Sequence, residues 1–239
     1  MLVTQTHITG TVGGGHLESV AIKWARAHAA LAHSIKNTLP YEIEYPLGSA
    51  LGQCCGGAMT LRYETLSPHH LNAMQAACAQ HKTLFLFGAG HVAQALVPLL
   101  TALPLRIVWA DSREAINTHQ VPFPLDLPSH ITTVVSDTLE AELTAAKRGD
   151  LVLIMSHSHA LDEALVHAAL KLQRLAYVGL IGSATKKRLF VKRLGSRGVS
   201  DADLQRVVCP IGMASPTTVH SKLPAVIALQ VAAQIVGFL

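Results

Sequence analysis

Short apolar runs separated by segments of helix length dominate the chain from Thr83 onward. The runs are mostly apolar and do not alternate regularly with polar residues, which is typical of strands buried on both faces of a parallel sheet. We therefore predict strands at 83–87, 105–110, 131–135, 151–155 and 176–181.

The spacing of apolar residues predicts helices between these strands. Two sets of residues each fall on one face of a helix: Leu96, Leu99, Leu100 and Leu103 in one segment, and Leu161, Leu165, Ala168, Ala169 and Leu172 in another. Strands that alternate with helices over such a stretch favour an α/β fold, with a Rossmann-like doubly wound parallel sheet and right-handed crossovers.

The first part of the chain, residues 1–80, has a different pattern. It contains glycine clusters, two adjacent cysteines and one predicted helix, whose apolar face is formed by Leu17, Val20, Ala21, Trp24, Ala27 and Leu31. We expect a smaller N-terminal α+β region over 1–80, followed by the Rossmann-like domain over 81–239.

The composition narrows the range of functions. Half of the 239 residues are hydrophobic and 14% are charged, which predicts a large core and argues against disorder. A net charge of +4 is small for a nucleic-acid-binding protein, and the sequence has no stripe of Lys and Arg interleaved with aromatic residues. A small phosphorylated ligand fits this balance better, and we expect no nucleic-acid partner.

We expect a cytoplasmic protein that does not enter the membrane. The chain does not open with a charged segment followed by an apolar run, so no signal peptide is predicted. The apolar segment 223–239 contains Pro224, Gln230 and Gln234 and is shorter than the ~20 residues of a spanning helix, so we predict a buried terminal helix. Four cysteines are too few for a disulfide scaffold and are expected to be reduced.

A glycine-rich turn follows the first predicted strand of the Rossmann-like domain. Residues 88–93, GAGHVA, match the G-x-G-x-x-G/A pattern, in which Gly88 permits a tight turn and Gly90 lets a diphosphate approach a helix N-terminus. Asp111 lies 21 residues after Gly90, where an acid can bind a ribose hydroxyl. The pattern predicts a nucleotide-type site. A turn that binds nothing is the alternative, and His91 is either a ligand contact or a solvent-facing residue.

A second glycine cluster, Gly13, Gly14 and Gly15, precedes a predicted helix and is followed by His16 and Glu18. Successive backbone N–H groups in such a cluster can form a nest for an anion, to which His16 and Glu18 can add side-chain contacts. A flexible turn that uses the glycines for their positive φ is the alternative.

The two adjacent cysteines, Cys54 and Cys55, lie between Gln53 and Gly56 in a glycine-rich segment. Adjacent cysteines do not fit a zinc pair, which needs a spacer between its ligands. Thiols between glycines can instead reach a soft metal or a sulfur-bearing ligand, so we predict a metal contact for Cys54 and Cys55 and cofactor contacts for the segment. A buried, apolar cysteine pair is the alternative.

Ligand-type side chains follow the fourth predicted strand, where loops of an open α/β sheet face the ligand crevice. His157, His159 and Asp162 can bind a metal or an oxyanion, and we predict cofactor contacts for the two histidines. In the alternative, Ser158 or Asp162 caps a helix and the histidines are surface residues.

Basic residues follow the fifth predicted strand. Gly182 frees the backbone, Ser183 can cap a helix, and Lys186 lies in the first turn, where a cation opposes the helix dipole. A bound anion would explain that placement, so we predict cofactor contacts for these three residues. A solvated basic helix face is the alternative.

Several unusual strings together resemble the XdhC/CoxI family. They are GTVGGGHLE (10–18), LGQCCGG (51–57), LFGAGHVAQAL (86–96), HSHALD (157–162), YVGLIGSATKKRLF (177–190) and CPIG (209–212), and they cover nearly the whole chain. The resemblance implies an N-terminal XdhC/CoxI-type region and a Rossmann-like domain. Members of this family usually carry a further segment ahead of the position where this chain begins, so a shortened form with weakened binding, or a misassigned start, is expected.

The resemblance also implies a function. XdhC-type proteins are accessory chaperones without turnover of their own that bind the molybdenum cofactor, in its molybdopterin form, and protect it while an oxo ligand is exchanged for a sulfido ligand. They deliver it to xanthine dehydrogenase, with a cysteine desulfurase as sulfur donor. Whether the protein forms a homodimer stays open.

Two other functions remain as alternatives. An NAD(P)-dependent oxidoreductase would use the GAGHVA turn but needs a proton-relaying group, and the sequence has no Tyr-x-x-x-Lys spacing near Tyr177. A Rossmann domain that serves only dimerisation would bind neither nucleotide nor pterin.

Overall fold

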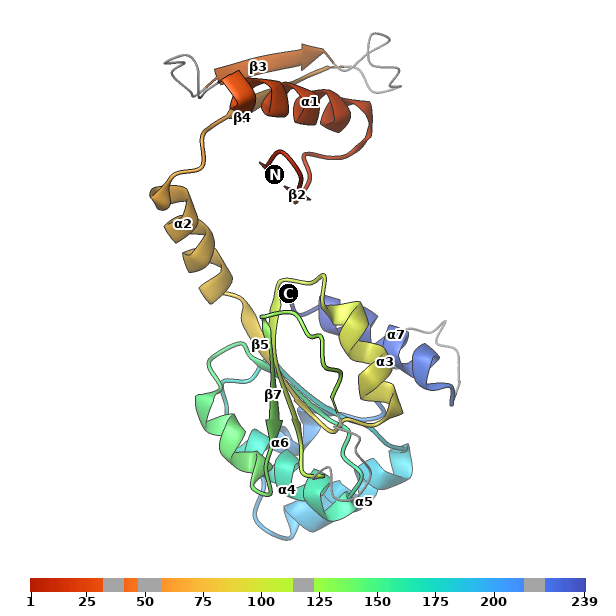
Figure 1. Cartoon of the computed structure of the whole chain (residues 1–239). Helices are drawn as coiled ribbons and strands as arrows, with labels where there is room; N and C mark the ends of the chain where they lie inside the picture. Colours follow the sequence, from red (N-terminus) through yellow and green to blue (C-terminus); the bar gives the residue numbers. More distant parts are fainter. Residues whose placement is uncertain (32–40, 47–56, 114–122, 213–221) are drawn as a thin grey trace. The chain divides into compact units, whose positions relative to one another are not determined.

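The chain divides into two units, Met1–Gln75 and Ala76–Leu239. The computed structural model describes residues 1–31, 41–46, 57–113, 123–212 and 222–239. Helix α2 (Pro68–Ala79) runs across the division, and none of its residues is buried (Figure 1). Helix α2 therefore adds no buried side chain to the core of either unit.

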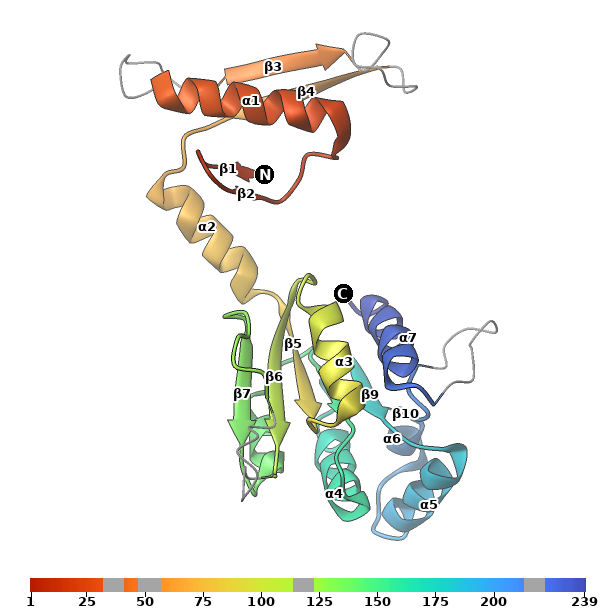
Figure 2. The same cartoon turned by 45° about the vertical axis from the view of Figure 1, so that its right-hand side comes forward.

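The N-terminal unit is a small α+β arrangement. Strands β1 (Leu2–Val3) and β2 (Ile8–Thr9) pair antiparallel, as do β3 (Tyr41–Pro46) and β4 (Ala58–Tyr63). Helix α1 (Gly15–Leu31) lies along the β3–β4 pair in Figure 2. Its predicted apolar face is only partly covered, because Leu17 and Ala21 are buried whereas Ala27 is exposed.

The second unit contains a six-stranded, fully parallel sheet. Its strands are β5 (Lys82–Phe87), β6 (Leu105–Asp111), β7 (Ile131–Val135), β8 (Leu151–Ile154), β9 (Tyr177–Leu180) and β10 (Val207–Val208), in the order β7-β6-β5-β8-β9-β10. This is the strand order of the Rossmann fold. The predicted fold class and its first five strands are confirmed. The sixth strand was missed because it has only two residues.

Helices cover both faces of the sheet, and each face has its own apolar core. Helices α3 (His91–Leu100) and α7 (Pro224–Val236) pack on the face that buries Leu84 and Leu86. The opposite face buries Phe85 and Phe87 against the elements η2, a 3₁₀ helix (Leu139–Ala145), α4 (His159–Leu170), α5 (Ala184–Gly195) and α6 (Asp201–Gln205). Alternate residues of β5 thus enter different cores, which explains why residues 84–87 of that strand are all apolar.

Two helix predictions need correction in detail. Leu99 is 43% exposed, because the buried face of α3 is formed by Ala93, Leu96, Val97 and Leu100. The terminal helix α7 buries one face only, and Leu229 on its other face is 62% exposed. Among the described residues, every helix is too short or too polar to cross a membrane.

Candidate functional site at the carboxyl ends of the strands

Strands β5 and β8 lie side by side at the centre of the sheet, where the strand order reverses. Ligands of open α/β sheets bind outside the carboxyl ends of the strands at such a switch point. The glycine turn that begins at Gly88 follows β5 directly and opens α3. The predicted nucleotide-type turn therefore has the position that its sequence context required.

Gly88 is fixed by its surroundings. Its φ is +112°, and a Cβ added there would lie 2.3 Å from the carbonyl oxygen of Met155. The N–H of Gly88 donates to the carbonyl oxygen of Ala110 at 2.7 Å, and the carbonyl oxygen of Gly88 accepts from the indole N–H of Trp109 at 2.9 Å. Only glycine fits this close approach of the loops that follow β5 and β8.

Gly90 leaves space in front of the helix. It has an ordinary φ of −78°, and a Cβ added there would meet no atom of the described residues within 4 Å. As the N-cap residue of α3 it has no side-chain cap, and the first helical hydrogen bond runs from Gln94 N–H to its carbonyl oxygen at 2.9 Å. The amides of the first helical turn are the groups to which a phosphate binds at a helix N-terminus, and Gly90 places no side chain in front of them.

Asp111 ends β6 and is 1% exposed. Its Oδ1 accepts from the backbone N–H and the Nε of Arg113, at 2.8 and 2.9 Å, and its Oδ2 accepts from Ala89 N–H at 2.5 Å and the second terminal nitrogen of Arg113 at 2.7 Å. Burial raises the pKa of Asp111, but the hydrogen bonds from Arg113 and Ala89 outweigh it and lower the pKa below its ordinary value. This carboxylate holds the glycine turn in place.

Asp162, in the first turn of α4, is also a buried acid, and it is fully inaccessible. Its Oδ1 accepts from the backbone N–H and the hydroxyl of Ser156, at 3.0 and 2.6 Å, and its Oδ2 lies 2.5 Å from the ammonium group of Lys186. Asp162 therefore ties the loop after β8 to the first turn of α5.

The three predicted site residues that follow β9 have structural roles in this connection between the loop after β8 and α5. Ser183 caps α5 by accepting from Lys186 N–H at 3.2 Å, as the sequence suggested. The side chain of Lys186 folds back over Gly182 and is 10% exposed. The pairing with Asp162 explains a cation in the first turn without a bound anion, so cofactor contacts of Gly182, Ser183 and Lys186 remain a prediction.

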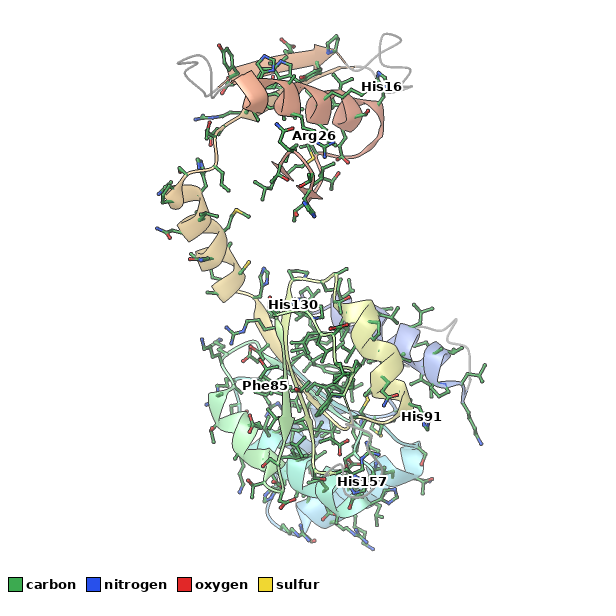
Figure 3. The ribbon with its side chains drawn as sticks, viewed as in Figure 1. His16, Arg26, Phe85, His91, His130 and His157 are labelled. Carbon is green, nitrogen blue, oxygen red and sulfur yellow. The ribbon has the colours of Figure 1, made fainter. Side chains whose placement is uncertain are left out.

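Three histidines at this end are exposed: His91, His157 and His159. Figure 3 shows His91 and His157 at the same end of the unit, whereas His130 lies at the opposite end of the strands. Ser158 caps α4 by accepting from Leu161 N–H at 3.4 Å, which was the alternative for this loop. Within the described ranges, no three His, Cys, Asp or Glu side chains are placed to hold a metal ion.

In the N-terminal unit, the glycine cluster already faces an anion. Glu18 Oε2 accepts from the backbone N–H groups of Val12 and Gly14, at 2.9 and 3.2 Å, and from the hydroxyl of Thr11. These bonds, with that of Thr11 the strongest, lower the pKa of Glu18. Gly13, Gly14 and Gly15 have positive φ, as both interpretations required, and His16 is exposed. A ligand at this nest would have to displace the Glu18 carboxylate.

The predicted thiol site lies outside the described residues, which include neither Gln53, Cys54, Cys55 nor Gly56. Of the two described cysteines, Cys78 on α2 is exposed and Cys209 is buried. Cys209 follows β10, and burial raises the pKa of its thiol although Lys186 and Lys187 act in the opposite direction. The soft-donor role of Cys54 and Cys55 therefore stays a prediction.

Sequence reasoning missed Arg113 and the full role of Asp162. Arg113 follows the predicted end of a strand by three residues, and an Asp-x-Arg sequence at that place was an available signal. The contact between Asp162 and Lys186 joins residues 24 positions apart and has no local signal.

A parallel sheet in this order, with a glycine turn at its switch point, defines a Rossmann domain of the nucleotide-binding type. The family model of the XdhC Rossmann domain matches residues 84–235, which is more than half of the chain. The chain belongs to the XdhC family, as the sequence strings indicated.

Two known proteins resemble the whole chain. The uncharacterized protein YqeB of Escherichia coli strain K12 is 28% identical over 234 residues, which cover 95% of this chain and 38% of YqeB, so the chain spans well under half of that relative. A crystal structure from Bacillus halodurans, described as a xanthine dehydrogenase, has a TM-score of 0.70 at 19% identity and covers 96% of this chain and 82% of that chain. At such identity, this second likeness concerns the fold.

Proposed function

We propose that this chain is an accessory protein that binds the molybdenum cofactor in its molybdopterin form, supports its sulfuration and inserts it into xanthine dehydrogenase. The observation that carries the proposal is the uncapped glycine turn at the switch point, in a chain that belongs to the XdhC family. The description of the Bacillus halodurans structure as a xanthine dehydrogenase supports the same association.

The turn fits the phosphate of such a cofactor. A side chain at Gly90 would project into the opening before α3, and glycine leaves that space to a ligand. The backbone N–H groups of the first turn supply donors, and the positive end of the helix dipole favours an anion. We assign further contacts with the ligand to His91 and His157, because both are exposed at the same end of the unit.

Sulfuration is the second part of the proposal. When bound, the cofactor supplies a molybdenum centre whose oxo ligand is exchanged for a sulfido ligand. We assign the soft-metal contact to Cys54 and Cys55, because a thiolate is a soft donor. The sulfur donor would be a cysteine desulfurase, and the exchange would take place in the cytoplasm, with the chain acting as a carrier that performs no turnover of its own.

The test is metal and pterin analysis of protein purified from a molybdenum-replete host under anaerobic conditions. We expect bound pterin in the wild type, detected as its fluorescent oxidation product. Cys54→Ala or Cys55→Ala should lower the molybdenum content, whereas Cys78→Ala, at an exposed thiol on α2, should not. Protein without pterin would refute cofactor binding, and unchanged molybdenum in both variants would remove the thiol role.

An NAD(P)-dependent oxidoreductase is the second candidate, and the Rossmann strand order with its glycine turn favours it. Titration with NADH and NADPH discriminates between the two. Micromolar binding of either nucleotide, by a protein that does not bind pterin, would favour the oxidoreductase.

A further inference from the structure

The acid at the end of β6 is not available to a ribose. A carboxylate has about four lone-pair sites, and Asp111 already accepts hydrogen bonds from Ala89 N–H and from three N–H groups of Arg113. Its side chain is also 1% exposed. In Rossmann domains that bind NAD, an acid at this place accepts hydrogen bonds from ribose hydroxyls, and here those positions are filled by the protein itself.

Arg113, unlike Asp111, has hydrogen-bonding groups that are exposed to solvent. Its side chain is 44% exposed, although two of its guanidinium nitrogens are held on the carboxylate by a bidentate contact. A guanidinium has five N–H donors. The remaining ones meet no acceptor among the residues that the structure describes. The contact fixes the orientation of the group and leaves its other edge without an acceptor from the described part of the chain.

The guanidinium of Arg113 lies beside the glycine turn. Asp111 Oδ2 accepts both from Arg113 and from Ala89 N–H, so the guanidinium and the amide of the turn are neighbours on one oxygen atom. A planar guanidinium held in a fixed orientation is the preferred protein partner of a phosphate, which it binds through two parallel hydrogen bonds. In related folds, an Arg near this place accommodates a phosphate on the ribose.

We propose that Arg113 makes this corner of the site a receptor for a phosphate monoester and, with Asp111 occupied, excludes an unmodified ribose diol. The proposal rests on the proposed function in that it concerns the same turn, and it specifies the ligand class. The phosphate can belong to a pterin whose side chain ends in a phosphate monoester, or to a nucleotide with a 2′-phosphate. A dinucleotide whose ribose carries two free hydroxyls is disfavoured.

The test compares ligands that differ by one phosphate. Affinities of the full chain for 2′,5′-ADP and 5′-AMP are measured by calorimetry at low salt, and molybdopterin is measured in parallel. Because charge-assisted hydrogen bonds are the strong ones, we expect wild type to prefer 2′,5′-ADP, or to bind molybdopterin, with Arg113→Ser lowering that affinity about tenfold or more. Arg106→Ser, at an exposed arginine near the amino end of the same strand, should leave both affinities unchanged.

The results distinguish a pterin phosphate from a nucleotide phosphate, and they distinguish failure of this inference from failure of the proposed function. Loss of molybdopterin binding in Arg113→Ser assigns the contact to the pterin phosphate, and loss of 2′,5′-ADP binding alone assigns it to a nucleotide. Molybdopterin binding that Arg113→Ser does not change, together with equal affinity for 2′,5′-ADP and 5′-AMP, overturns this inference and leaves the proposed function standing. Preferential binding of 2′,5′-ADP by a protein that does not bind molybdopterin supports this inference and refutes the proposed function.

Removal of Arg113 leaves Asp111 buried with fewer partners, so thermal unfolding is followed for each variant. If Arg113→Ser does not fold, Arg113→Lys is used, because it keeps the charge and loses the bidentate geometry. We expect Arg113→Lys to retain part of the phosphate preference. No binding of either 2′,5′-ADP or molybdopterin by the folded wild type also overturns the inference.

Discussion

Lys186 in α5 reaches the carboxylate of Asp162 in α4, with Nζ 2.5 Å from Oδ2 and both side chains withdrawn from solvent. The same ammonium group donates to the carbonyl oxygen of Ile181 at 2.9 Å, and the same carboxylate accepts from Ser156. This ion pair joins the loops after β8 and β9, which form one side of the candidate site.

Loss of the cation should destabilise the Rossmann unit. Lys186→Met leaves the carboxylate of Asp162 buried without its counter-charge, and breaking a buried pair in this way costs about 3–5 kcal/mol. We expect that loss in the free energy of unfolding from urea titration. Arg188→Met is the matched control, because Arg188 is exposed and, among the described residues, donates only to the hydroxyl of Thr185, so about 0.5 kcal/mol or less is expected. Equal losses in both variants would contradict a structural role for the pair.

The two glycines of the turn should respond differently to alanine. Gly88→Ala places a methyl group 2.3 Å from the carbonyl oxygen of Met155 at a φ of +112°, so we expect a loss of at least about 3 kcal/mol or no folded protein. Gly90→Ala meets nothing and has an ordinary φ, so the fold should survive with a loss below about 1 kcal/mol.

Ligand binding provides the second readout for this pair. The methyl group of Gly90→Ala occupies the opening before α3, so pterin content should fall about tenfold or more while the melting temperature stays close to that of the wild type. Full pterin content in a folded Gly90→Ala protein would show that the ligand does not approach this turn.

Stability should depend on the charge of Asp111 at low pH. Its pKa in the folded protein lies below the ordinary value of 3.8, so the folded state binds this proton less readily than the unfolded chain does. The resulting stabilisation is fully present well above pH 3.8 and is lost as the pH falls through the lower, folded-state pKa. Asp111→Asn lacks the stabilisation by the charged carboxylate, so its stability deficit relative to wild type should shrink as the pH falls.

The measurement is urea unfolding of wild type and Asp111→Asn over a pH series from neutral to acidic. Asp137→Asn, at an exposed acid, serves as the control and should differ from wild type by a constant amount. A deficit of Asp111→Asn that stays constant down to the acid limit would mean that the Arg113 contact does not hold the charge.

The sheet could be predicted from the sequence because each of its first five strands carries its own local signal. In β5, Leu84 and Leu86 lie in one core and Phe85 and Phe87 lie in the other. Burial on both faces therefore requires an uninterrupted apolar run, which the sequence shows. β10 has no such signal, because a strand of two residues is defined by its pairing with β9.

The site could be predicted only where its geometry is local. The glycine turn lies within six residues, and the position of Asp111 follows from the strand it ends. The partner of Asp111 was not predicted. Its hydrogen bonds with Arg113 depend on how the chain turns back after the strand. The anion in the N-terminal nest is Glu18, a residue of the same cluster, and sequence reasoning treated it as a contact for a ligand instead.

The two described cysteines should differ in reactivity, which bears on the assignment of the soft donors. Burial raises the pKa of Cys209, and its side chain is largely inaccessible, whereas Cys78 is exposed on α2. Because the thiolate is the reactive form, iodoacetamide at neutral pH should alkylate Cys78 about tenfold or more faster than Cys209 in the native protein, and both at similar rates in urea. Peptide mass spectrometry after short exposures measures both rates in one sample. Rapid native alkylation of Cys209 would make this thiol, which follows β10, a further candidate for the soft-metal contact, whereas slow alkylation leaves Cys54 and Cys55 as the proposed donors.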